Sequence, residues 1–261
     1  MLRKAAILAL LVTFVAIPAV AQEKERGPLT WIAFSELKPG KTEDAVKMAM
    51  ENKEFMDGLV ADGTILSWGM ATPINHFPDD SWNFVEWVNV ASWAKIDEWF
   101  GRFMAHMQGL DEATMKSMQE RGREIYVEGS HFDEIVRNHV FATGEGGAPM
   151  RFMYAAMFNA KDDEAMVKFF KEAVVPALDE MVADGTMTGY GIQSREIHVD
   201  ADWTHRFWYG LPGLASIDKM TAKFGEAMSP AVQGWAETVF KNEGHYDKVL
   251  MILYSSTNPE E

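Results

Sequence analysis

The chain has 261 residues, a formal net charge of -15 and no cysteine. Nucleic acid and anionic lipid are excluded as expected partners, because so acidic a surface would repel both. Without cysteine there is no disulfide, thiolate nucleophile or thiolate metal ligand, so packing must hold the fold together. Eighteen Met, sixteen Phe and nine Trp residues are available for that packing.

The first 21 residues have the pattern of a secretory signal peptide. Arg3 and Lys4 precede an uncharged apolar stretch, and Ala19 and Ala21 are the small residues expected before a cleavage site. The apolar stretch is shorter than the ~20 residues that a membrane span requires. We therefore expect residues 1–21 to be removed and the mature chain to be periplasmic or secreted, with no membrane span.

The elements of a first unit follow in residues 22–141. Apolar runs separated by turn residues predict four strands, at residues 29–37, 65–71, 82–90 and 131–141. A helix is predicted between the first two strands, capped by Thr42 and stopped by Gly63. A second helical region begins near Ser92 and is interrupted around Gly109. The predicted order is β-α-β-β-α-β.

A second unit with the same order is predicted at residues 150–261. Residues 142–149 contain three glycines and have the composition of a linker between the units. The predicted strands of the second unit are residues 150–158, 187–194, 203–209 and 248–254. Its predicted helices begin at Asp162, Ser216 and Ser229. We expect Pro176 to kink the first of them.

The two units are copies of one sequence. The pentapeptide VADGT at residues 60–64 recurs unchanged at residues 182–186. Trp68-Gly69 then matches Tyr190-Gly191, Trp87 matches Trp208, and Asp133 matches Asp247. A period above 100 residues is too long for a solenoid, so each copy is predicted to be a domain-sized unit.

The order β-α-β-β-α-β predicts an α+β fold of two ferredoxin-like units, each a sheet with helices on one face. The bare faces can be buried by packing the two sheets together as an internal pseudo-dimeric α/β barrel. Residues 34–41, FSELKPGK, followed by an acidic helix start, resemble the dimeric α/β-barrel superfamily and its antibiotic-biosynthesis-monooxygenase-like members. The resemblance implies ligands between sheet and helices or inside the barrel.

The third strand of each copy carries two kinds of candidate residues on its two faces. One face is apolar apart from two candidate catalytic groups, Glu86 and His205. Strand alternation places Trp82 and Trp203 on this face as well. Such groups among apolar neighbours acquire perturbed pKa values suited to acid-base catalysis. The alternative is that each group is paired locally or lies at an exposed strand end. The other face carries candidate ligand-binding residues, which are Asn83, Trp87, Arg206 and Trp208.

The last strand of the first copy adds Arg137 and His139 as candidate catalytic residues, because neither has a polar counterpart in the second copy. His131 and Asp133, by contrast, recur as His245 and Asp247. The paired His-x-Asp is consistent with a metal-orienting imidazole and with a structural hydrogen bond.

These residues predict an exported protein that binds a small apolar or aromatic molecule and needs no metal or other cofactor. A cofactor-independent monooxygenase-like activity is one form of this hypothesis. Two alternatives stay open: a non-catalytic binding or assembly protein, and a haem or metal protein of the chlorite-dismutase type. The absence of histidine from the predicted helices of the second copy argues against haem. Further association of two chains is also left open.

Overall fold

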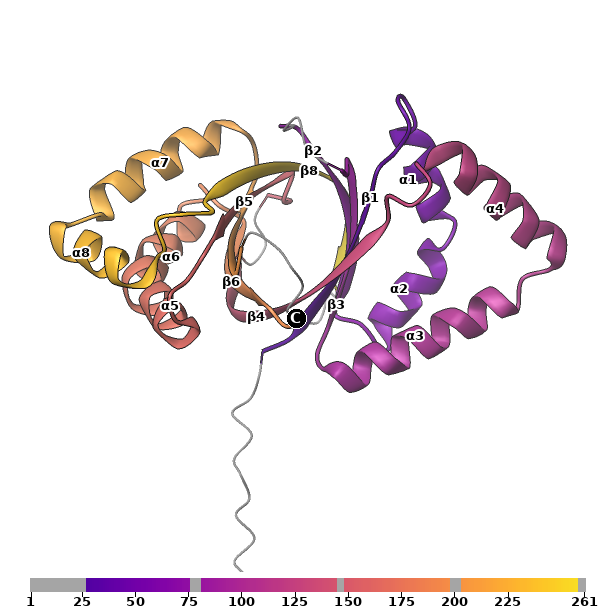
Figure 1. Ribbon diagram of the computed structural model, residues 1–261, viewed down its shortest axis with the longest axis horizontal. Helices are drawn as coiled ribbons and strands as arrows, with labels where there is room; N and C mark the ends of the chain where they lie inside the picture. The colour runs from indigo at the N-terminus through magenta and orange to yellow at the C-terminus, as the bar shows by residue number, and fades with distance from the viewer. Residues whose placement is uncertain (1–26, 76–80, 145–147, 198–202, 258–261) are drawn as a thin grey trace, which may run out of the picture.

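The computed structural model describes residues 27–75, 81–144, 148–197 and 203–257. Its strands close into one antiparallel barrel with the order β1-β3-β2-β8-β5-β7-β6-β4, in which β4 returns to β1 (Figure 1). The strands are β1 (Leu29–Ser35), β2 (Ser67–Pro73), β3 (Phe84–Val90), β4 (Phe132–Thr143), β5 (Phe152–Phe158), β6 (Gly189–Arg195), β7 (His205–Leu211) and β8 (Tyr246–Thr257). The predicted pseudo-dimeric barrel of two ferredoxin-like units is confirmed.

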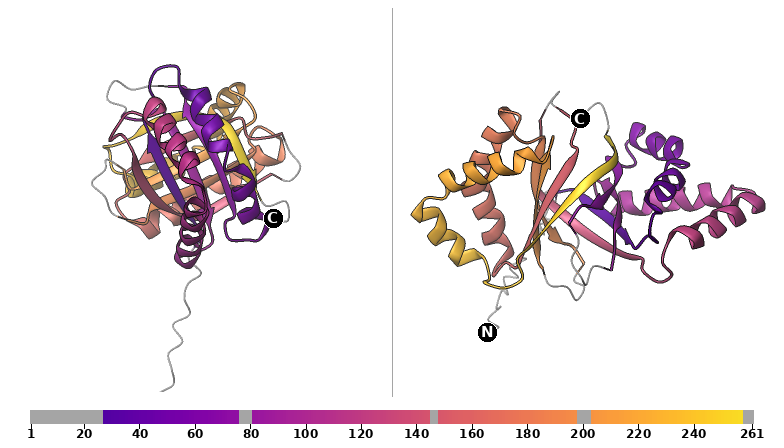
Figure 2. Two further views of the ribbon diagram at one scale, coloured as in Figure 1. Left: turned by 90° about the vertical axis from the view of Figure 1, so that its right-hand side faces the viewer. Right: turned by 90° about the horizontal axis from the view of Figure 1, so that it is seen from above.

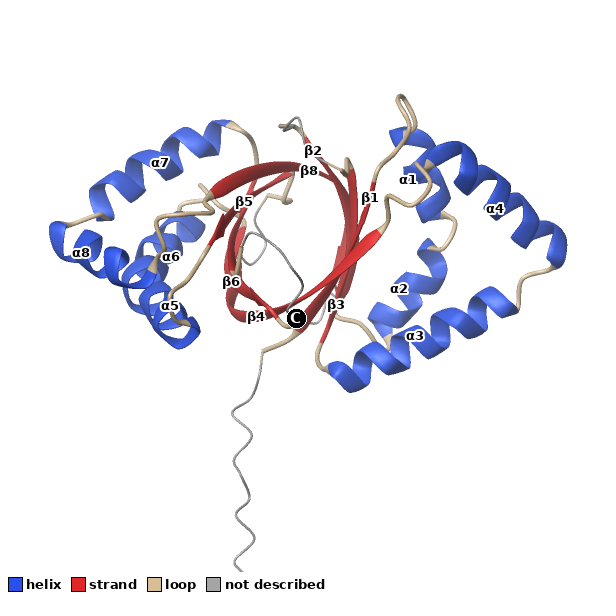
Figure 3. Cartoon of the chain, in the orientation of Figure 1, coloured by secondary structure: helices blue, strands red, loops and turns tan. Residues whose placement is uncertain are grey.

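Helices pack on the outside of this barrel on two opposite sides (Figures 2 and 3). Those of the first unit are α1 (Thr42–Met50), α2 (Lys53–Ala61), α3 (Trp93–Gln108) and α4 (Glu112–Ile125). Those of the second unit are α5 (Asp163–Phe169), the π-helical turn η1 (Phe170–Val174), α6 (Val175–Ala183), α7 (Ala215–Ala227) and α8 (Pro230–Val239). No helix within the described ranges is long and apolar enough to cross a membrane.

Two long strands join the sheets of the two units. The first half of β4 pairs with β1 and its second half pairs with β6. In the same way β8 pairs first with β5 and then with β2. Because each of these strands belongs to both sheets, every strand has two neighbours and the barrel has no open edge.

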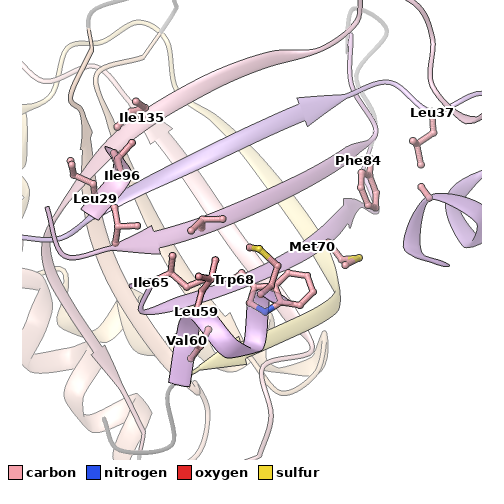
Figure 4. Packing of buried hydrophobic residues seen from close by; sticks show 14 of the residues in the cluster. Leu29, Leu37, Leu59, Val60, Ile65, Trp68, Met70, Phe84, Ile96 and Ile135 are labelled. Atoms are coloured by element: carbon pink, nitrogen blue, oxygen red, sulfur yellow. The ribbon is translucent and has the colours of Figure 1, made fainter. Parts of the chain in front are cut away.

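The apolar residues form two layers outside the barrel wall and one inside it. In each unit the outer layer lies between sheet and helices, and the first one includes Leu29, Leu59 and Phe84 (Figure 4). The second outer layer includes Phe169 and Phe207. The inner cluster lies in the barrel and consists of Ile32, Phe34, Ala71, Val85, Val136, Ala155, Met157 and Trp203.

Three local expectations need correction. The first predicted helix is two helices, α1 and α2, and Thr42 is its first residue without capping it through its side chain. Strand β4 continues to Thr143, so the segment expected as a linker from residue 142 begins inside a strand. Instead of a simple kink at Pro176, the structure has a π-helical turn, η1, just before the proline. Proline lacks the N–H group that would bond the preceding turn, so regular α-helical bonding is interrupted there.

Candidate functional site

Alternation along β3 and β7 places the candidate residues on opposite sides of the barrel wall. Glu86 and His205 are flanked along their strands by residues of the two outer apolar layers, so they face the helices. Trp87 belongs with the inner cluster, and Arg206 lies on the same side of the wall. The two predicted faces are therefore real, but no single ligand can touch both, because the sheet lies between them.

Trp82 and Trp203 do not lie on the predicted face. Both pack with the inner cluster, where the Trp82 ring meets Phe34 edge-on at a centroid distance of 4.9 Å. The prediction was wrong because β3 begins at Phe84 and β7 at His205, so both tryptophans precede their strands and strand alternation does not apply to them.

Glu86 lies in the sheet–helix layer of the first unit. Its neighbours across β1 and β2 are Ala33 and Met70. Burial raises the pKa of Glu86, while the nearby His131 opposes that shift. Among the residues that the structure describes, none forms a hydrogen bond or ion pair with this carboxyl group, yet solvent still reaches part of its side chain. Glu86 is thus a desolvated acid that a ligand could approach.

Tyr126 is the group beside Glu86 that the sequence did not reveal. Burial raises the pKa of the Tyr126 phenol, and the negative charge of Glu86 raises it further. The phenol therefore stays protonated at neutral pH and can donate a hydrogen bond. Its position at the end of α4, where it bridges to Leu37, is set by tertiary packing and has no sequence signal.

The second unit has a histidine pair at the corresponding layer. His139 Nε2 and Ser194 Oγ are 2.6 Å apart, and the His139 ring lies 6.5 Å from the ring of His205. His205 is completely buried, its Nε2 has no hydrogen-bond partner, and Asp163 Oδ1 is 3.9 Å from it. Burial lowers the pKa of His205 to about 4 and also lowers that of His139, aided there by Arg137.

This shift predicts a specific loss of stability in acid. Between pH 6.5 and about 4 the unfolded chain binds a proton at His205 and the folded chain does not, so the free energy of unfolding falls by up to about 3 kcal/mol. His205→Phe introduces the residue found at the equivalent position, Phe84, and should flatten this part of the profile. Urea unfolding of both proteins from pH 7.5 to 4 measures the difference. Parallel profiles would contradict the assignment.

Arg137 and Asn83 have structural partners. Arg137 Nε donates to Glu196 Oε2 at 2.6 Å, and Nη1 donates to the Gly27 carbonyl at 2.8 Å. The Asn83 amide pairs with both backbone groups of Leu37, at 2.6 Å and 3.0 Å. Both side chains are thereby occupied by the fold, and neither reaches Glu86 or the barrel interior as a free group.

The tryptophans inside the barrel each lie over a glycine. Trp87 pairs across the sheet with Gly69, and Trp208 pairs with Gly191. A Cβ atom at Gly69 would be 2.3 Å from the Trp87 ring, and one at Gly191 would be 2.5 Å from that of Trp208. Since β3 and β7 are opposite in the strand order, the two rings line opposite walls.

A chain of hydrogen bonds holds Arg206 inside the barrel. Arg206 Nε and Nη2 donate to Gln193 Oε1 at 2.8 Å and 2.6 Å. Gln193 Nε2 donates to Asn138 Oδ1 at 2.7 Å, and the chain continues through Thr30 and Asn89. The sequence predicted Arg206 as a ligand-binding residue but not Gln193, because a polar residue on one strand does not reveal its partner on the next.

The His-x-Asp pairs form contacts within each unit. His131 Nε2 is 3.3 Å from Asp133, and His245 Nε2 is 3.1 Å from Asp247. Within the described ranges, no three His, Asp or Glu side chains are grouped to hold a metal ion. The described histidines of the second unit also have protein neighbours. His205 is enclosed by protein, and the His245 ring stacks on Phe158 at 4.5 Å.

No protein-family model and no curated protein matches the sequence. Solved structures do match. A candidate monooxygenase from Lactobacillus acidophilus has 16% identity and a TM-score of 0.57, covering 89% of this chain and 97% of its own. One from Fusobacterium nucleatum has 12% identity and a TM-score of 0.58, covering 89% and 95%. An anthrone oxidase-like protein has 10% identity and a TM-score of 0.52, covering 91% and 95%. At these identities the likeness concerns the fold.

Proposed function

Because the chain has the dimeric α/β-barrel fold, we propose that it is a cofactor-independent oxygenase acting on an apolar or aromatic substrate in the sheet–helix layer of its first unit. The observation that carries the proposal is the Glu86 carboxyl group, which lies among apolar side chains and forms no hydrogen bond or ion pair within the described residues. A carboxylate in such surroundings is a stronger base than one in water.

Glu86 would act as the general base. Its ionised form takes a proton from a weakly acidic C–H or O–H group of the substrate, which leaves an electron-rich anion on the substrate. Tyr126, held protonated by the same burial, donates a hydrogen bond to that anion. The anion then reacts with dioxygen, so that a methylene group and O2 give a carbonyl group and water. The candidate monooxygenases and the anthrone oxidase-like protein of the same fold support this reaction class.

Oxygen uptake tests the proposal directly. The purified protein, treated with chelator, is offered a panel of anthrones, hydroquinones and naphthols, whose C–H or O–H groups are weakly acidic. We expect oxygen consumption above the uncatalysed rate with at least one member, and a carbonyl product that matches the oxygen consumed. Failure of the whole panel, with the folded state verified by circular dichroism, would favour the non-catalytic binding alternative.

We also propose that the protein is exported, as its first 21 residues predict. These residues lie outside the described ranges, and their pattern alone supports this step. Mass spectrometry of the protein made in a bacterial host should show a mature chain that begins at Gln22. Ala21→Arg should leave the precursor uncut, since signal peptidase requires a small residue there. A wild-type chain that retains Met1 in the periplasmic fraction would contradict the proposed cleavage.

A further inference from the structure

The interior of the barrel is a second compartment, separated from Glu86 by the sheet. The barrel is closed, yet solvent reaches part of four side chains on its inner wall, Trp87, Asn89, Arg206 and Trp208. Other residues of the inner wall, such as Ile32 in β1 and Val85 in β3, are by contrast buried. The inner wall is thus closely packed in one part, while in another part its polar and aromatic side chains are only half-buried.

Arg206 is the unusual group of this inner wall. Both of its hydrogen bonds go to the neutral amide oxygen of Gln193, and its Nη1 has no acceptor among the described residues. The nearby carboxylate Glu134 is bonded to Arg195 at 2.7 Å. Burial lowers the pKa of the Arg206 guanidinium, and the negative charge of Glu134 opposes that shift only in part. A desolvated cation whose hydrogen bonds go only to a neutral amide is costly unless a further anion joins it.

The first unit shows that the fold does not require this pair. Gln193 and Arg206 are cross-strand partners in β6 and β7, and the equivalent cross-strand partners in β2 and β3 are Ala71 and Val85. Those two residues fill the same place with apolar contacts. Since the apolar pair suffices on one side of the pseudo-twofold axis, the polar pair on the other side calls for an explanation other than packing.

Neighbouring residues orient the guanidinium and provide aromatic surface. Asn138 accepts the hydrogen bond of the Gln193 amide nitrogen, which turns the amide oxygen toward Arg206. The Trp203 ring centre is 5.4 Å from Arg206 Cζ, and Trp208 lies on the same face of β7. A guanidinium matches the two oxygens of a carboxylate, and the tryptophan rings match a flat aromatic body.

We propose that the barrel lumen binds an aromatic carboxylate, with the carboxylate on Arg206 and the ring against Trp208 and Trp87. This site is independent of the proposed oxygenase site, because Glu86 faces the other side of β3. Gln193 is a positioning residue that fixes the guanidinium. The lumen would thus hold a separate small acid, and its occupancy does not depend on turnover at Glu86.

The test is calorimetric titration of the full mature chain with 2-naphthoate and with the neutral 2-naphthalenemethanol. We expect one naphthoate per chain and at least about 30-fold weaker binding of the alcohol, since a buried charged hydrogen bond is lost. Arg206→Val should weaken naphthoate binding by a similar factor, while Arg206→Lys should retain part of it. The double variant Gln193→Ala with Arg206→Val restores the apolar pair of the first unit and provides a folded protein without the site.

Glu86→Gln is the control for location and should leave naphthoate binding unchanged. Three outcomes would overturn the lumen site: no naphthoate binding to the folded wild type, equal binding to wild type and Arg206→Val, or loss of binding in Glu86→Gln. Oxygen uptake by Arg206→Val separates the two proposals. Normal oxygen uptake together with lost naphthoate binding would support the lumen site. Loss of oxygen uptake in a folded Arg206→Val variant would contradict the independence of the two compartments.

Discussion

Glu86→Gln should lower kcat of the oxygen-consuming reaction by about 10²- to 10⁴-fold, the usual contribution of a general base. The amide has nearly the size of the carboxyl group, so packing in the sheet–helix layer is preserved while the base is removed. Because burial raises the pKa of Glu86, the wild-type kcat/KM should decline on acidification at a pH above 4.5, the ordinary value for this side chain. The variant should lack that decline.

The same substitution should make the protein more stable at neutral pH. The raised pKa means that the folded state holds the Glu86 proton more tightly than the unfolded chain does. Stability associated with this group is therefore present at low pH and is lost as pH rises through the folded pKa. An uncharged amide has no such loss. Activity and stability should thus move in opposite directions, as expected of a functional group and not of a packing residue.

Urea unfolding at pH 7 and initial oxygen-uptake rates measure the two effects. Glu43→Gln is the matched control, because Glu43 is 80% exposed and pairs with Lys47 on the same helix; it should change neither quantity by much. Glu86→Asp, which keeps a carboxylate, should recover part of the activity. If Glu86→Gln lost both activity and stability, Glu86 would be a structural residue.

Gly191→Ala and Gly69→Ala should each destabilise the protein by about 1–3 kcal/mol, the usual cost of overpacking. The new methyl group at Gly191 would be 2.5 Å from the Trp208 ring and 2.9 Å from the Val140 carbonyl oxygen. At Gly69 it would be 2.3 Å from the Trp87 ring and 2.5 Å from the Tyr254 carbonyl oxygen. The carbonyl oxygens belong to neighbouring strands of a closed barrel, so the backbone cannot move away freely.

Gly58→Ala, another glycine-to-alanine substitution, should have the opposite effect on stability. Gly58 is exposed in α2, and a Cβ atom there would meet nothing within 4 Å. Alanine should therefore stabilise the helix by roughly 0.5–1 kcal/mol. Thermal unfolding of the three variants, with tryptophan fluorescence as the probe, compares them directly. Equal stability of all three would mean that the rings do not lie over Gly69 and Gly191.

The duplicated sequence was enough to predict the order of the elements along the chain and to match equivalent residues of the two units. The glycines beneath the tryptophans carried a usable signal as well, because Trp68-Gly69 recurs as Tyr190-Gly191, and glycine within a strand indicates a close approach. Tyr126 and Gln193 had no such signal in the sequence. Their roles depend on which side chain lies beside them, and each of those neighbours comes from another strand or helix.

The sequence by itself determined that Glu86 and Trp87 lie on opposite faces of one strand, because side chains in a strand alternate with a period of two. It also determined that each unit needs a second sheet to cover its bare face. Only the tertiary structure decided which face is which. That choice depends on where the helices pack and on how β4 and β8 join the two sheets into a barrel. Both are long-range contacts, and a period of two reads the same from either side of a sheet.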